Sequence, residues 1–139
     1  MIVGVSHAGL ENVRRLSHEV MVAGAAGVMV APPAGLKGDD GRLQLLCPGS
    51  SRRSGPDIPV VYQDYPQTTG VYLAPSVFER LVDDFKQLVM LKHEDAPGLA
   101  KLARVREGER SPDAGASRSW SAMAGSTCRR RCGAAPTAP

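Results

Sequence analysis

Short apolar runs recur along residues 1–106, and each run predicts a buried strand. The runs are rich in Val and Ile and do not alternate with polar residues, which is typical of parallel strands covered on both faces. They begin 25, 31 and 30 residues apart, a spacing that favours repeated strand–helix units. The sequence therefore predicts parallel strands at Ile2–Val5, Gly27–Ala31, Ile58–Tyr62 and Leu88–Leu91.

Apolar residues at helical spacing predict helices between these runs. The first helix should end at Gly24, just before the second strand. Pro75 marks the first turn of another helix, and a third begins near residues 95–97. The inward-facing residues are expected to be Leu10, Val13, Leu16, Val20 and Met21, then Val77, Phe78, Leu81, Val82 and Phe85, and finally Leu99, Leu102 and Val105.

Two stretches break the pattern. Residues 42–54 contain a Pro-Gly-Ser-Ser sequence that would interrupt a helix, although a parallel crossover normally needs one there. From Glu107 onward the chain is rich in Ser, Gly, Ala, Arg and Pro without an apolar period, which is typical of a disordered extension. We therefore expect one domain over residues 1–106 and a separate tail over residues 107–139.

A shifted reading frame is a second interpretation of both stretches. Read one nucleotide earlier, residues 119–130 can encode an apolar strand followed by a Gly-rich turn, and residues 42–48 can encode a helix-like segment. Trp120 and all the cysteines fall inside the two stretches. The alternative is a genuine polar loop and a disordered tail, and the nucleotide sequence would decide between them.

Composition narrows the class of protein. A chain of 139 residues that is 42% hydrophobic can form one globular domain. No apolar run approaches the roughly 18–20 residues of a membrane helix, and no signal peptide opens the chain. We therefore expect a cytoplasmic protein with no membrane partner.

Charge and ligand spacing argue against two further classes of partner. The net charge is +3, but most of the excess lies in the tail. Arg129–Arg131 would give salt-dependent nucleic-acid binding, yet the balanced charge of residues 1–106 predicts no such partner. His7 and His93 have no second ligand at metal spacing, so no metal site is expected. An odd number of cysteines argues against a disulfide framework; they are Cys47, Cys128 and Cys132.

Four segments carry a resemblance to a known family. They read IVGVSH (2–7), AGAAGVMVAPP (23–33), DIPVVYQDYPQTTG (57–70) and LVMLKHED (88–95). In order and spacing they are similar to the third to sixth barrel strands of the dihydrodipicolinate synthase / N-acetylneuraminate lyase family. The resemblance implies an α/β fold: a partial (β/α)8 TIM barrel of about four βα units, with a disordered C-terminal tail.

Lys92 is the candidate nucleophile. The resemblance implies that this lysine forms a Schiff base with a 2-oxo acid such as pyruvate. Its position after a buried apolar run fits that role, because barrel enzymes place catalytic groups at the carboxyl ends of their strands. An apolar pocket would favour the neutral amine that the reaction needs. The alternative is a surface lysine paired with Glu94 or Asp95, while His93 is expected to pack on the opposite face, outside the barrel.

Several positions depart from the family pattern. Gln63 stands where the family usually has a tyrosine that relays protons, and an amide cannot titrate. Thr68 stands where the synthases have an arginine that binds a substrate carboxylate, and a hydroxyl cannot replace a bidentate guanidinium. Thr69 and Gly70 could offer backbone donors to a substrate or form a plain turn. Tyr65 would share the face of Gln63 only if the strand continued, which Pro66 opposes.

The resemblance thus implies a lyase, aldolase or dehydratase that acts on a small 2-oxo acid, in a family that forms homo-oligomers and needs no cofactor. The residues present do not indicate that the reaction is dihydrodipicolinate synthesis itself. The alternative is an inactive remnant of such an enzyme, truncated and damaged by frame shifts.

Overall fold

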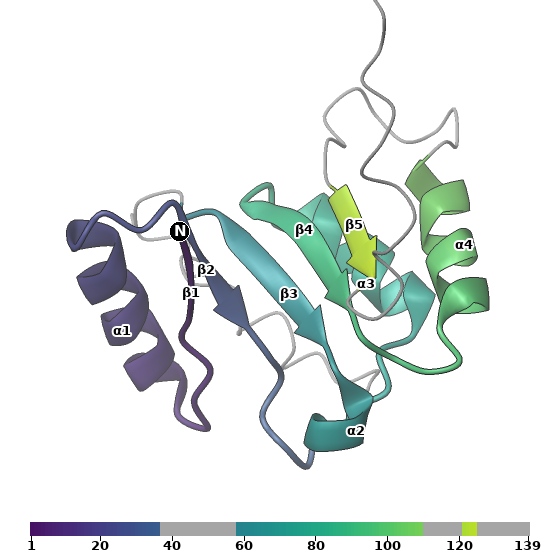
Figure 1. The fold of residues 1–139 in the computed structure, drawn as a ribbon, viewed down its shortest axis with the longest axis horizontal. Helices are drawn as coiled ribbons and strands as arrows, with labels where there is room; N and C mark the ends of the chain where they lie inside the picture. The colour runs from purple at the N-terminus through teal and green to yellow at the C-terminus, as the bar shows by residue number, and fades with distance from the viewer. Residues whose placement is uncertain (37–57, 110–120, 125–139) are drawn as a thin grey trace, which may run out of the picture.

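A parallel sheet forms the centre of the molecule. The computed structural model describes residues 1–36, 58–109 and 121–124. Its strands are β1 (Ile2–Gly4), β2 (Gly27–Val30), β3 (Val60–Asp64), β4 (Leu88–His93) and β5 (Ser121–Ala124). They pair side by side in chain order, and every pair is parallel (Figure 1). The predicted α/β architecture of repeated βα units is confirmed.

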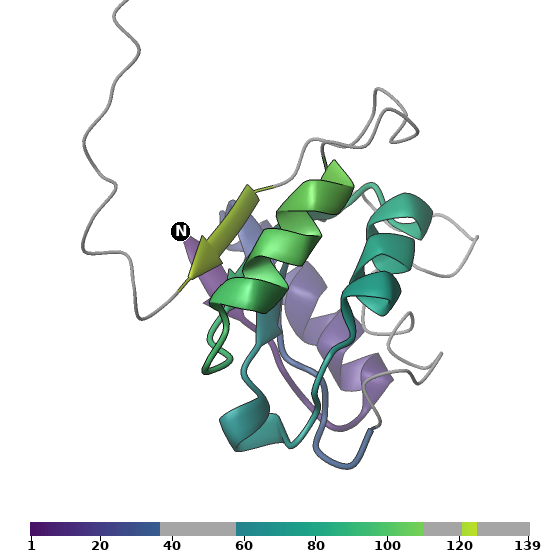
Figure 2. The same ribbon diagram turned by 90° about the vertical axis from the view of Figure 1, so that its right-hand side faces the viewer.

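The longer helices cover one face of this sheet. The helices are α1 (Leu10–Val22), α2 (Pro66–Thr69), α3 (Pro75–Asp84) and α4 (Leu99–Glu109). Figure 2 shows α1, α3 and α4 on the same side, while the short α2 lies at the end of β3. No helix of the described residues is long and apolar enough to cross a bilayer. The two faces of the sheet therefore have different surroundings.

One apolar core joins the sheet to the helices. Val28, Val60, Tyr62 and Leu91 of the strands lie in a single buried cluster with Val13 of α1. The same cluster includes residues of α3 and α4: Val77, Phe78, Leu81 and Val105. The Tyr62 and Phe78 rings meet edge to face at 6.4 Å, an arrangement that aromatic pairs favour. The helical faces predicted for α1 and α3 are thus the faces that pack on the sheet.

The inward face of α4 differs from the prediction. Val105 is buried as expected, but Leu99 is 69% exposed and Leu102 is half-buried. Lys101, four residues before Val105, faces the sheet instead, because its ammonium reaches the carboxylate of Asp64. The face of α4 that packs on the sheet therefore includes Lys101 as well as Val105, and it is not purely apolar.

Two of the strands end later than predicted, whereas β1 and β2 each end one residue earlier. β3 continues through Gln63 and Asp64, and β4 continues through Lys92 and His93. The extra residues pair across the ladder, Gln63 with Lys92 and Asp64 with His93. The apolar runs end before the strands do, because the last two residues of each strand are polar. Each of these polar side chains has a bonding partner in the structure.

The C-terminal part of the chain contains secondary structure that the sequence did not predict. Residues Ser121–Ala124 form β5, paired with β4, inside the segment expected to be a disordered tail. α4 likewise extends past residue 106 to Glu109. The stretch 42–54, all the cysteines and Arg129–Arg131 lie outside the described residues.

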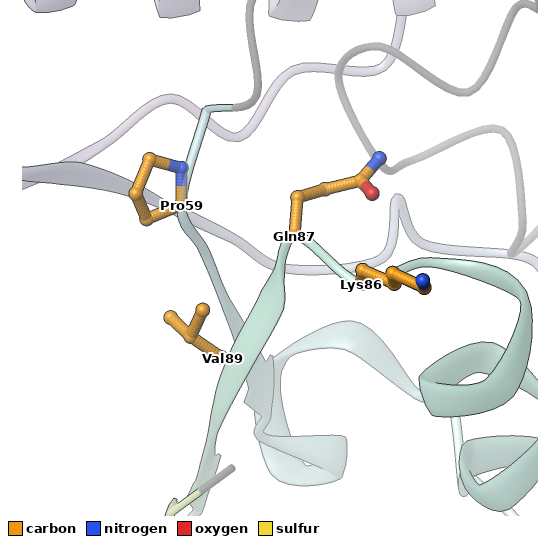
Figure 3. Close-up of a pocket in the computed structure, with 4 residues that line it drawn as sticks. All are labelled: Pro59, Lys86, Gln87 and Val89. Atoms are coloured by element: carbon orange, nitrogen blue, oxygen red, sulfur yellow. The ribbon is translucent and has the colours of Figure 1, made fainter. Parts of the chain in front are cut away.

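The amino ends of β3 and β4 are irregular. The register shifts between Val60 and Val61, so that Val89 has no partner in β3 and is 37% exposed. An open hollow of about 280 Å³ lies there, lined by Pro59, Lys86, Gln87 and Val89 (Figure 3). Gly27 faces this end of β3, and a side chain at that position would meet the Pro59 carbonyl oxygen at 2.8 Å. This bulge lies at the amino ends of the strands, whereas Lys92 lies near their carboxyl ends.

Candidate active site at the carboxyl ends of the strands

Polar side chains gather at the carboxyl ends of β3 and β4 and point to both faces of the sheet. Neighbouring residues of a strand point in opposite directions. Tyr62 and Leu91 belong to the helix-facing core, so Asp64 and His93 share their side, while Gln63 and Lys92 point the other way. The sheet end therefore carries two separate groups of polar residues.

The group on the helix face is closed and ionic. We call Asp64, His93 and Lys101 the helix-side cluster. The Asp64 Oδ2 atom lies 2.8 Å from His93 Nδ1 and 2.7 Å from Lys101 Nζ. The Asp64 and His93 side chains are only 1% and 2% exposed. Since a carboxylate without a partner is costly at such burial, the contacts from His93 and Lys101 stabilise Asp64.

Both ring nitrogens of His93 have a partner in this arrangement. Its Nδ1 lies 2.8 Å from the Asp64 carboxylate, and its Nε2 lies 3.0 Å from the Gly98 carbonyl oxygen. These two contacts fix the orientation of the imidazole ring between β3 and the loop before α4. The absence of a side chain at Gly98 matters as well, since an added Cβ would collide with the His93 ring and the Asp95 carbonyl.

The group on the other face is smaller and partly open to solvent. We call Gln63, Lys92 and Glu94 the open-side cluster. Lys92 Nζ lies 3.1 Å from Glu94 Oε1, and Gln63 Nε2 donates to Glu94 Oε2 at 2.6 Å. The side chains of Lys92 and Glu94 are 27% and 23% exposed. Glu94 therefore links the two predicted catalytic residues, which do not contact each other through any other described bond.

Lys92 lies where the sequence placed it, but its surroundings differ from those expected. The side chain stands at the carboxyl end of β4, on the face away from α3 and α4. Its nitrogen contacts a carboxylate rather than lying in a purely apolar pocket. The pairing with Glu94, which the sequence offered as the alternative, is the one that forms.

Thr69 and Gly70 serve the turn after β3. The Thr69 N–H donates to the Tyr65 carbonyl at 3.1 Å, and the Gly70 N–H donates to the Pro66 carbonyl at 2.8 Å. Gly70 ends α2 with φ of 69°, a left-handed conformation that favours glycine. Both N–H groups are thus used within the turn, which is the alternative that the sequence left open, and a role of these residues toward a substrate stays a prediction. Tyr65 begins this turn instead of continuing β3, as Pro66 predicted.

Two contributors were missed by sequence reasoning. Lys101 was hidden in a helix whose apolar residues suggested a different inward face, and Glu94 was considered only as a pairing partner of a surface lysine. His93 does lie on the face opposite Lys92, as expected. Among the described residues, no group of three or more His, Cys, Asp or Glu side chains could hold a metal ion.

Comparison with known proteins identifies the family. No family model matches the chain. A 4-hydroxy-tetrahydrodipicolinate synthase of Thermus thermophilus is 33% identical over 93 residues, which are 67% of this chain and 31% of the relative. The dihydrodipicolinate synthase structure from Rhodopseudomonas palustris superposes with a TM-score of 0.74 at 41% identity, over 88% of this chain and 40% of that one. The chain belongs to the dihydrodipicolinate synthase family.

Further solved structures agree on the fold. The enzyme from Thermotoga maritima gives a TM-score of 0.72 at 25% identity, over 89% of this chain and 40% of that one. A 2-keto-3-deoxygluconate aldolase from Picrophilus torridus gives 0.68 at 17% identity, over 88% and 40%. The described sheet is thus part of a TIM barrel. The chain spans 31% of the length of the curated relative that it matches.

Proposed function

We propose that this protein is a lyase or aldolase that forms a Schiff base between Lys92 and a 2-oxo acid such as pyruvate. The observation that carries the proposal is the position of Lys92. It stands at the carboxyl end of a parallel strand, on the face away from the helices, in a chain that belongs to a family of pyruvate-related lyases. A family relative from E. coli, similar in fold, was crystallised in complex with pyruvate.

The chemistry assigns a defined role to the Lys92 amine. The neutral nitrogen attacks the ketone carbon, and a C–N bond forms while the carbonyl oxygen takes up a proton. A second proton then reaches that oxygen, and its loss as water gives an iminium ion. The iminium withdraws electrons from the adjacent carbon, which allows a C–C bond to form or break there. Gln63 contributes hydrogen bonding only, because its amide does not titrate.

The substrate is proposed at the level of a small 2-oxo acid. The hydroxyl of Thr68 cannot make the bidentate contact that an arginine would give to a second carboxylate. The proposal therefore does not extend to dihydrodipicolinate synthesis. A cytoplasmic location and a homo-oligomeric state stay predictions from sequence and family resemblance.

Reductive trapping tests this function directly. We expect the 139-residue chain, incubated with pyruvate and cyanoborohydride, to gain one reduced adduct on Lys92, located by peptide mass spectrometry. Lys92→Arg should abolish the adduct, and Lys86→Arg, a change of an exposed lysine beside the hollow in Figure 3, should not. An adduct spread over the exposed lysines and unchanged in Lys92→Arg would contradict the proposal.

A second candidate is an inactive relative of these enzymes. The observation that favours it is the ion pair of Lys92 with Glu94, because a carboxylate beside an amine stabilises the protonated form, which is not nucleophilic. On this reading the trapping experiment yields no adduct on Lys92. The two candidates thus predict opposite results in one measurement.

A further inference from the structure

Glu94 lies between the two predicted catalytic residues and contacts both of them. One carboxylate oxygen contacts Lys92 Nζ at 3.1 Å and the other accepts from Gln63 Nε2 at 2.6 Å. The residue follows β4 directly, and its N–H donates to the Asp64 carbonyl at 2.9 Å. Glu94 is thus fixed at its backbone and at both carboxylate oxygens.

The neighbouring loop adds to this support. With the amide of Gln67 turned so that nitrogen faces oxygen, it donates to the Glu94 carbonyl at 3.2 Å and accepts from the Ala96 N–H at 3.1 Å. Asp64, which holds the Glu94 N–H, is itself fixed by the helix-side cluster. A carboxylate held in this way loses little side-chain freedom when it acts on a neighbouring group.

The proposed reaction needs a group that can move protons, and the open-side cluster contains one. Lys92 must lose a proton before it attacks, and the carbonyl oxygen must gain protons before it leaves as water. Gln63 cannot do either. The other nearby carboxylates are committed elsewhere: Asp64 lies on the helix face, and Asp95 lies 3.5 Å from Lys101.

We propose that Glu94 is the general acid–base of the Schiff-base reaction, an inference that rests on the function proposed above. Glu94 Oε1 takes one proton from the Lys92 ammonium and leaves a neutral amine. After attack, Glu94 gives this proton to the former carbonyl oxygen, and a carbinolamine forms. Glu94 then takes a second proton from the nitrogen and passes it to the carbinolamine hydroxyl, which departs as water when the C=N bond forms, so Glu94 ends the step as a carboxylate.

The partial burial of the pair fits this role. At 27% and 23% exposure the two side chains are neither freely solvated nor sealed, so a bound ligand can displace the remaining water. Removal of water disfavours the two charges relative to a neutral amine and a neutral acid, because both ions lose hydration. Exclusion of water by a bound substrate would therefore favour transfer of the proton from Lys92 to Glu94.

Two reactions of Lys92 separate this role from simple charge pairing. Acetylation by acetic anhydride needs only the neutral amine, whereas condensation with pentane-2,4-dione also needs protons delivered to a leaving oxygen. Both can be followed at Lys92 by peptide mass spectrometry in the full 139-residue chain, and neither depends on recognition of a 2-oxo acid. Failure to trap pyruvate would thus remove the proposed function without deciding the role of Glu94.

Opposite effects are expected on the two reactions. In Glu94→Gln, acetylation of Lys92 should become faster because the carboxylate no longer stabilises the ammonium. Condensation should become about 100-fold slower because the acid–base group is gone. Glu94→Asp should restore condensation to within about tenfold of the unchanged chain. Glu11→Gln, at a carboxylate that is 88% exposed on α1, should change neither rate.

Three results would overturn the inference. The first is a Glu94→Gln chain that condenses as fast as the unchanged chain or faster. The second is a parallel loss of acetylation and condensation, which would mean that the substitution merely displaces Lys92. The third is an unchanged chain in which Lys92 condenses no faster than the exposed Lys86.

Discussion

The two polar clusters at the ends of β3 and β4 share the same strands but differ in almost every physical respect. The helix-side cluster is sealed, with Asp64 and His93 side chains at 1% and 2% exposure. The open-side cluster is partly solvated, with Lys92 and Glu94 at 27% and 23%. Neighbouring residues of one strand thus enter two environments, because successive side chains point to opposite faces.

This difference in burial indicates which charged side chains stabilise the fold and which can take part in a reaction. In the helix-side cluster the Asp64 carboxylate is held by both His93 and Lys101 and is almost sealed from solvent, so a substrate does not reach it. In the open-side cluster a single carboxylate faces a single amine, and a proton passed between them leaves neither group with an unpaired charge. We infer that the first cluster holds the sheet to α4 and that the second is available for chemistry.

The largest expected effect is the removal of the Asp64 charge. Asp64→Asn should lower the free energy of unfolding by about 3–5 kcal/mol, because it removes the buried carboxylate that both His93 and Lys101 contact. Urea unfolding followed by circular dichroism measures this loss. Glu11→Gln is the matched control on an exposed carboxylate, and a loss for Asp64→Asn no greater than for this control would show that the cluster does not hold the fold.

A smaller effect is expected from Lys101. Lys101→Met keeps the aliphatic part of the side chain but removes the bond to Asp64 at 2.7 Å, so unfolding should become easier by about 2 kcal/mol. Asp64 keeps His93 as its partner, which is why the loss is less than in Asp64→Asn. Lys86→Met, at an exposed position, serves as the control in the same urea titration. Equal midpoints for the two variants would argue against the attachment of α4 by this ion pair.

The smallest stability effect should come from the open-side cluster. Glu94→Gln should change the free energy of unfolding by less than about 1 kcal/mol, because a partly exposed ion pair contributes little. The same substitution is expected to change the reactivity of Lys92 strongly, as argued above. A loss as large as that of Asp64→Asn in the urea titration would erase the distinction between the two clusters.

Much of the fold could be predicted from the pattern of apolar residues. The runs led by Ile2, Gly27 and Leu88 each start a strand at that residue, and the stripes around Val13 and Phe78 pack on the sheet. These elements were readable because burial against one face imposes a period on the sequence. Lys92 could be placed at the carboxyl end of a strand for the same reason, since it directly follows a buried run.

The site itself could be predicted only in part. Nothing in the sequence marked Lys101, because its role depends on Asp64, which lies in a different element. β5 has no apolar run of its own and pairs with β4 inside a segment without a helical or strand period. For Thr69 and Gly70 the sequence left substrate donors and a plain turn as alternatives, and in the structure their N–H groups are bonded within the turn.

The sequence by itself determined where most of the strands lie, which faces of α1 and α3 are buried, and which residue carries the amine. Only the tertiary structure decided which charged side chains meet, because Gln63, Lys92 and Glu94 come together across two strands whose ladder runs farther than their apolar runs do. Burial of one face of an element requires apolar residues at a regular spacing along one segment of the chain. An ion pair depends instead on the distance between atoms of different segments, and that distance is fixed only when the chain has folded.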